Sequence, residues 1–132
     1  MRIDTPAPHL YLVHCENPED LGPERQEVLV RELMEASART RVAVVLSLKA
    51  EVRLLDFEVS RYWHDVLRRM PLACLALATP SRAVLSAARG FAMANRLFKS
   101  PIAVEAFTQE EDAVRWAQYI LGPAPLAASA VR

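Results

Sequence analysis

Four short apolar runs, separated by helix-length segments, constrain the fold of this chain more than any other feature. The runs occupy residues 9–15, 41–48, 72–79 and 101–107. Continuous apolar runs of this length are typical of strands that are covered on both faces, as in a parallel sheet. The sequence therefore predicts four clear strands.

The segments between these runs carry apolar residues at helical spacing. They extend from Pro23 to about Ala38, and over residues 57–70, 80–98 and 109–121. In each of them charged residues occupy the remaining positions, which is typical of an amphipathic helix on the surface of a core. The sequence predicts four helices, with Pro23 well suited to the first position of the first one.

Polar residues at the ends of these segments indicate where helices begin. Thr79 is predicted to be an N-cap, with Pro80 as the first helical residue. Thr108 and Glu111 have the spacing of a capping box, in which each side chain accepts a hydrogen bond from the other's backbone amide. Gly122 is expected to end the last helix.

Alternation of strands and helices predicts an α/β fold, with a single, mostly parallel sheet of about four to five strands. We place one domain at residues 1–122 and expect the small, weakly apolar tail 123–132 to be disordered. Trp63 and Trp116 are expected in the core rather than as ligand-stacking residues. Predicted core positions in the strands are Val44, Leu46, Leu75, Leu77, Ala103 and Val104.

Charge and composition argue against several classes of function. Sixteen basic residues balance sixteen acidic ones among 132 residues, so the net charge favours neither nucleic acid nor an anionic membrane as partner. Cys15 and Cys74 each lie in an apolar run, which favours two buried thiols and a reducing compartment. The sequence contains neither a signal-peptide core nor a bilayer-length apolar run, so we expect a cytoplasmic protein without stable membrane insertion.

No combination of residues predicts an active site, a metal site or a cofactor. Ser60 and His64 are four residues apart on a helix and can touch, but Asp65 points about 100° away from His64. No Gly-x-Ser-x-Gly elbow surrounds Ser60. The Cys and His residues lack metal-ligand spacing, and three glycines are too few for a phosphate-binding loop. We therefore expect a protein that is not an enzyme.

Four stretches carry a resemblance to a known family: "RVAVVLSL", "LLDFEVSRYW", "LACLALATPSRAVLSAARGF" and "PIAVEAFTQEEDAVRWA". They resemble the STAS superfamily, the relatives of bacterial anti-sigma-factor antagonists, including a stand-alone group similar to STAS and SEC14-type lipid-binding domains. The most family-like piece is the strand ending in Phe107 with the following "EEDAVRWA". The likeness covers about residues 41–121. The family usually has two strands before the first helix, and "MRIDTP" would have to supply the one that is not evident here.

The resemblance implies a position for a regulatory serine, which this chain fills with another residue. Regulated members carry an aspartate, then a phosphorylatable serine, then Ser-Gly, where a strand turns into a helix. Asp56 matches the aspartate and also suits a helix N-cap, but Phe57 stands at the serine position. Ser60 lies later, on the polar face with His64, where a solvated serine is the ordinary case. We expect that Ser60 is not a switch.

The expected function is binding. The resemblance implies a non-enzymatic protein-interaction or regulatory module that presents the start of its second helix and the neighbouring surface to a partner. The alternatives are a carrier of lipid or of another small apolar ligand, which the SEC14-like relatives imply, and a small hydrolase. An arginine stripe at a seven-residue step on the third helix is by itself more typical of a solvated face. The predicted binding face, for an acidic protein surface or a second copy of the chain, comprises Glu58, Ser60, Arg61, His64, Arg82, Arg89 and Arg96.

Overall fold

The structure, a computed structural model, describes residues 2–49 and 57–122, and within them one sheet has the strand order β1-β2-β3-β4-β5. β1 is antiparallel to β2, and the other neighbours are parallel, which confirms the predicted α/β fold. The strands are β1 (Arg2–Ala7), β2 (Leu10–Cys15), β3 (Ala43–Leu48), β4 (Cys74–Ala78) and β5 (Ala103–Phe107). The helices are the short 3-10 helix η1 (Pro18–Leu21), α1 (Pro23–Ser37), α2 (Phe57–Arg69), α3 (Arg82–Leu97) and α4 (Glu110–Leu121).

β1 is the strand that the sequence left in doubt. It pairs with β2 so that Arg2 lies opposite His14 and Ala7 opposite Leu10. Almost all of its residues are exposed, because it lies at the edge of the sheet. The edge also tolerates Pro6, which has no amide to donate to a neighbour, and the register shifts in this part of the strand.

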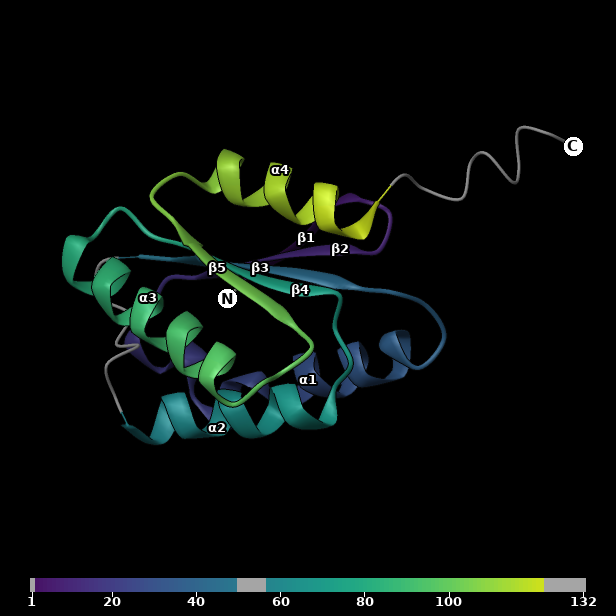
Figure 1. The fold of residues 1–132 in the computed structure, drawn as a ribbon, viewed down its shortest axis with the longest axis horizontal. Helices are drawn as coiled ribbons and strands as arrows, with labels where there is room; N and C mark the ends of the chain where they lie inside the picture. The colour runs from purple at the N-terminus through teal and green to yellow at the C-terminus, as the bar shows by residue number, and fades with distance from the viewer. Residues whose placement is uncertain (1, 50–56, 123–132) are drawn as a thin grey trace, which may run out of the picture.

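Helices cover the two faces of the sheet unequally. Among the described helices, α1, α2 and α3 pack on one face, and α4 packs on the other (Figure 1). Successive strand residues alternate between these layers, so Val44 and Leu46 face the three helices, whereas Ala43 and Val45 face α4. The predicted strand positions are buried except Ala103, which is half-buried against the α4 layer.

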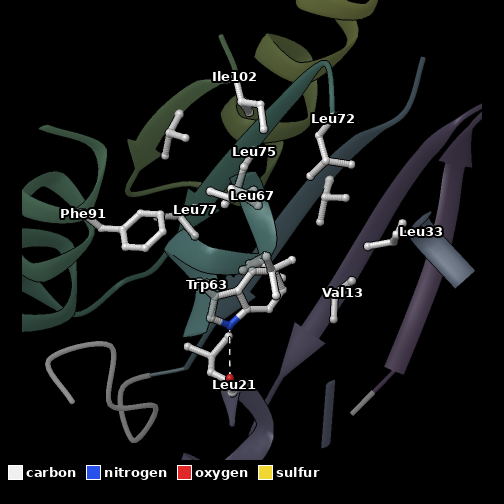
Figure 2. Close-up of a cluster of buried hydrophobic side chains, with 14 of the residues drawn as sticks. Val13, Leu21, Leu33, Trp63, Leu67, Leu72, Leu75, Leu77, Phe91 and Ile102 are labelled. Atoms are coloured by element: carbon white, nitrogen blue, oxygen red, sulfur yellow. Dashed lines mark hydrogen bonds between the residues drawn. The ribbon is translucent and has the colours of Figure 1, made fainter. Parts of the chain in front are cut away.

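Trp63 lies in the core of the three-helix layer, as predicted. The side chain is 1% exposed, and its Nε1 donates a hydrogen bond to the carbonyl oxygen of Leu21 at 3.1 Å (Figure 2). The Tyr62 ring meets it edge-on, with 5.8 Å between the ring centroids. Trp116 is half-buried on the other face, where its ring lies 5.6 Å from that of Phe107.

The predicted start of the third helix is wrong by two residues. α3 begins at Arg82, and the hydroxyl of Ser81, its N-cap, accepts a hydrogen bond from the Val84 amide at 3.3 Å. The Thr79 hydroxyl instead accepts one from the Ser81 amide at 3.2 Å, which forms a local turn through Pro80. The turn delays the helix, because two competing hydroxyls lie within one segment.

The predicted capping box at the last helix is also wrong. α4 begins at Glu110 with Gln109 as N-cap, so Glu111 is the second helical residue, whereas a capping box requires the third. Acidic residues in the first turn of α4 still favour its N-terminus electrostatically. Gly122 ends the helix at φ 79°, a conformation that glycine adopts readily. The predictions for residues 123–132 and for the N-cap of α2 lie outside the described residues.

Candidate binding surface on α2 and α3

α2 and α3 contact each other through aromatic side chains. The imidazole of His64 on α2 stacks on the ring of Phe91 on α3, with centroids 4.1 Å apart and 16° between the planes. The ring of Phe98 meets the same imidazole edge-on at 5.5 Å. Both helices lie on the same face of the sheet and lead into parallel strands, so their first turns lie towards the carboxyl edge of the sheet.

His64 therefore departs from the predicted solvated face. It is half-buried between the two phenylalanine rings, and burial, together with the charge of Arg68, lowers its pKa below the ordinary value of 6.5. Ser60, one turn earlier, is also half-buried. No hydrogen bond joins Ser60 to His64 within the described ranges, so the arrangement of a nucleophile with its base is not formed there.

The lowered pKa of His64 predicts a pH-dependent stability. As the pH falls below 6.5, the unfolded chain takes up a proton at His64 that the folded chain resists, so the free energy of unfolding should fall until the pH reaches the folded pKa. His64→Phe keeps a stacked ring that cannot titrate. Urea unfolding, measured from neutral pH down to about pH 5, should show a weaker decline for this variant than for wild type. Equal declines would contradict the prediction.

The predicted binding residues fall into two separate sets. Arg96 forms an ion pair with Glu105 on β5, so it lies on the side of α3 that faces this strand. Arg82 and Arg89 share that side because they precede it at seven-residue steps. At 100° per residue, Arg89 lies about 160° around the helix from Phe91, which contacts α2. The arginine stripe and the contact with α2 thus lie on opposite flanks of α3, with the outer side of the helix between them.

The α2 residues lie around the first two turns of the helix. Glu58 and Arg61 are exposed, whereas Ser60 and His64 are half-buried towards α3. Among the described residues, no carboxylate lies within ion-pair distance of Arg61. We define Glu58, Ser60, Arg61 and His64 as the α2 set.

The outer side of α3 adds exposed apolar groups to this surface. A Cβ atom built on Gly90 would meet no atom within 4 Å, so tight packing on the sheet does not explain this glycine. Met93 and Leu97, three and seven residues further on, lie on the same side of the helix and are 62% and 74% exposed. Gly90, Met93 and Leu97 together form a surface that another backbone can approach closely.

A cavity of about 760 Å³ opens between the C-terminal ends of α2 and α3. Its apolar lining includes Leu67, Leu72 and Ile102, which are buried, and Phe98, which is 70% exposed. Figure 2 shows Leu72 and Ile102 at the end of the buried cluster that lies away from Leu21. The exposed cationic residues in its lining are Arg68, Arg69 and Lys99.

Sequence reasoning missed this cavity. Its lining comes from two stretches, 64–72 and 95–102, that form no motif and meet through the packing of α2 beside α3. One signal was available in the sequence. Leu97 and Phe98 are two consecutive large apolar residues at the end of the third helix, followed by Lys99, and they do not fit the helical spacing of its other apolar residues.

A second polar cluster lies at the other face of the sheet. The Nε2 atom of His14 lies 3.0 Å from an oxygen of Asp4 and 3.1 Å from the Arg2 guanidinium, and its Nδ1 atom lies 3.6 Å from Glu110. This buried histidine connects the edge strand β1 to the first turn of α4. In the described ranges, no three His, Cys, Asp or Glu side chains are placed to hold a metal ion.

Comparison of the chain with protein-family models, with curated proteins and with solved structures finds no match. Among the helices that the structure describes, none combines the length and the apolar character needed to cross a bilayer.

Proposed function

We propose that this protein is a non-enzymatic module that binds another protein through the α2 set and the outer side of α3. The observation that carries the proposal is the exposure of Met93 and Leu97 beside Gly90, on a helix that contacts the α2 set. When a partner covers apolar side chains that are exposed to water, the free energy of the complex is lowered. Methionine and arginine are both enriched in protein interfaces.

The charge of this surface supports an acidic partner. Arg61 is exposed without a carboxylate partner in the described part of the chain, so a partner's carboxylate can pair with it bidentately. The resemblance of residues 41–121 to the STAS superfamily supports the same region, because its members present the start of the second helix to partners. We accordingly propose a regulatory role of the STAS type, with a second copy of the chain as the alternative partner.

Reversing the charge of Arg61 should weaken the complex, and reversing that of Arg115, on the opposite face of the sheet, should not. We expect Arg61→Glu to lower the affinity for a partner captured from the native host at least tenfold, or about 1.4 kcal/mol. Arg115→Glu makes the same change on α4, which covers the opposite face of the sheet, and should leave the affinity within about twofold. Biolayer interferometry measures both, and sedimentation velocity tests self-association.

Gly90→Ala adds a charge-free test of the same surface. The added methyl group meets no atom within 4 Å in the folded chain, so the variant should fold normally. It should weaken binding if the partner approaches the helix at this position. An equal loss of affinity in Arg61→Glu and Arg115→Glu, or no loss in Arg61→Glu, would overturn the proposal.

A further inference from the structure

The cavity between the ends of α2 and α3 has an apolar floor that protein binding at the α2 set does not use. Leu67, Leu72 and Ile102 line it while remaining buried. Its volume of about 760 Å³ falls within the roughly 300–1,000 Å³ of small-molecule sites, which are mostly apolar with a few polar groups. Phe98 also lines it and holds its ring 70% exposed, so a ligand would cover this ring.

The polar groups near the floor are already satisfied within the protein. The side-chain amide of Asn95 donates a hydrogen bond to the carbonyl oxygen of Ile102 at 2.8 Å. The hydroxyl of Ser100 accepts one from the Ile102 amide at 3.2 Å. The interior therefore offers little to a polar ligand body and favours an apolar one.

The mouth of the cavity carries an excess of positive charge. Arg68 and Arg69 share one carboxylate, that of Asp65, at 3.7 and 3.2 Å. Lys99 has no carboxylate within ion-pair distance among the residues that the structure describes. The C-terminal ends of α2 and α3 each contribute about half a negative charge, and these cations offset it in part. One carboxylate and two half charges from the helix ends offset about two of the three positive charges. About one net positive charge is left, which a single anionic group would balance.

We propose that this cavity binds a small amphipathic anion, with its carboxylate or similar head at Lys99 and Arg68 and its apolar body over Leu72 and Ile102, against Phe98. This inference goes beyond the proposed protein binding and does not depend on it. Lys99 follows Phe98 in a left-handed conformation, φ 55°, that costs a non-glycine residue free energy. The strained residue is therefore the one that carries the unpaired charge at the mouth.

Isothermal titration calorimetry with decanoate, below its micelle concentration, tests the proposal. We expect saturable binding at one site with a negative heat-capacity change. Decyltrimethylammonium, with the same chain and the opposite charge, should bind at least about tenfold more weakly. Equal binding of the two amphiphiles would overturn the proposal.

Matched variants locate the site. Phe98→Ala should weaken decanoate binding about tenfold, whereas Leu97→Ala should not, because Leu97 is equally exposed but does not line the cavity. Lys99→Gly should also weaken binding about tenfold and, because glycine adopts positive φ without strain, should raise the unfolding midpoint. Arg89→Gln controls for the loss of one positive charge. An equal loss in Leu97→Ala and Phe98→Ala would place decanoate elsewhere and overturn the proposal.

A free amphiphile and an anionic lipid in a bilayer both carry a negatively charged head on an apolar chain. A second experiment, flotation with phosphatidylglycerol vesicles, therefore distinguishes the two sources. Vesicle binding that requires Phe98 and Lys99 assigns the ligand to a bilayer lipid. Decanoate binding without vesicle binding assigns it to a free molecule. Both results support the site, and failure of both probes overturns it.

Discussion

Replacing Trp63 with alanine should lower the free energy of unfolding by about 3–5 kcal/mol, because it empties part of the larger core layer. The indole is 1% exposed, and its Nε1 atom is hydrogen-bonded to the Leu21 carbonyl oxygen. The substitution leaves a cavity and removes the donor from a carbonyl that lies beside a buried side chain. A loss of this size is a large fraction of the roughly 5–15 kcal/mol by which a domain is stable. Urea unfolding followed by far-ultraviolet circular dichroism measures it.

The second tryptophan provides the matched control. Trp116 is half-buried on the α4 face, and no hydrogen bond of its indole is found within the described ranges. Trp116→Ala removes the same number of atoms but less buried area, so it should cost clearly less. Trp63→Phe keeps most of the ring without its N–H group and should fall between them. Equal losses for the two alanine variants would contradict the central role of Trp63.

The strands that are buried on both faces could be predicted from the sequence, and the edge strand could not. The run 41–48 contains β3, because a strand covered by helices on both faces must be apolar at successive positions. β1 is exposed along nearly all of its length and contains Pro6, so it shows neither an apolar run nor alternation. Its position depends on pairing with β2, a long-range contact.

The sequence left open both the exact start of α3 and the identity of the helix that packs beside it. Thr79 and Ser81 are both good N-caps, and the local sequence does not decide which hydroxyl caps α3. The seven-residue spacing predicted that Arg82, Arg89 and Arg96 share one side of α3. It could not predict that α2 lies beside Phe91, on the side away from Arg89, because that contact joins different helices. For the same reason the cavity was not foreseen.

Cys15 and Cys74 should react with iodoacetamide far more slowly in the folded protein than an exposed cysteine does. Both are free and buried, as the sequence predicted. Burial raises the pKa of each thiol from 9.0 to about 12, and the charge of Asp20 adds to the effect at Cys15. The thiolate fraction at neutral pH falls tenfold for each unit of pKa, so reactivity should fall about a thousandfold before access is considered. Mass spectrometry of the labelled protein measures it, with the urea-unfolded chain as the reference.

The two thiols should also differ from each other, because they lie in different layers. Cys15 faces the three-helix layer, and Cys74 faces α4. The α4 layer is rich in alanine, so separating one helix from it exposes less apolar area than opening the other layer does. Two hydrogen bonds from the Arg41 guanidinium to the last carbonyls of α4, each 3.2 Å, add a restraint at the surface.

We therefore expect the single-thiol variant Cys15→Ala, which keeps Cys74, to be labelled several-fold faster than Cys74→Ala, which keeps Cys15. Arg41→Ala should accelerate labelling of Cys74 and leave that of Cys15 unchanged, because it releases α4 without touching the other layer. If both thiols are labelled at equal rates, and these rates change in parallel with the free energy of global unfolding, the two layers open together. In that case α4 belongs to the same cooperative unit as the three-helix layer, despite its smaller apolar contact.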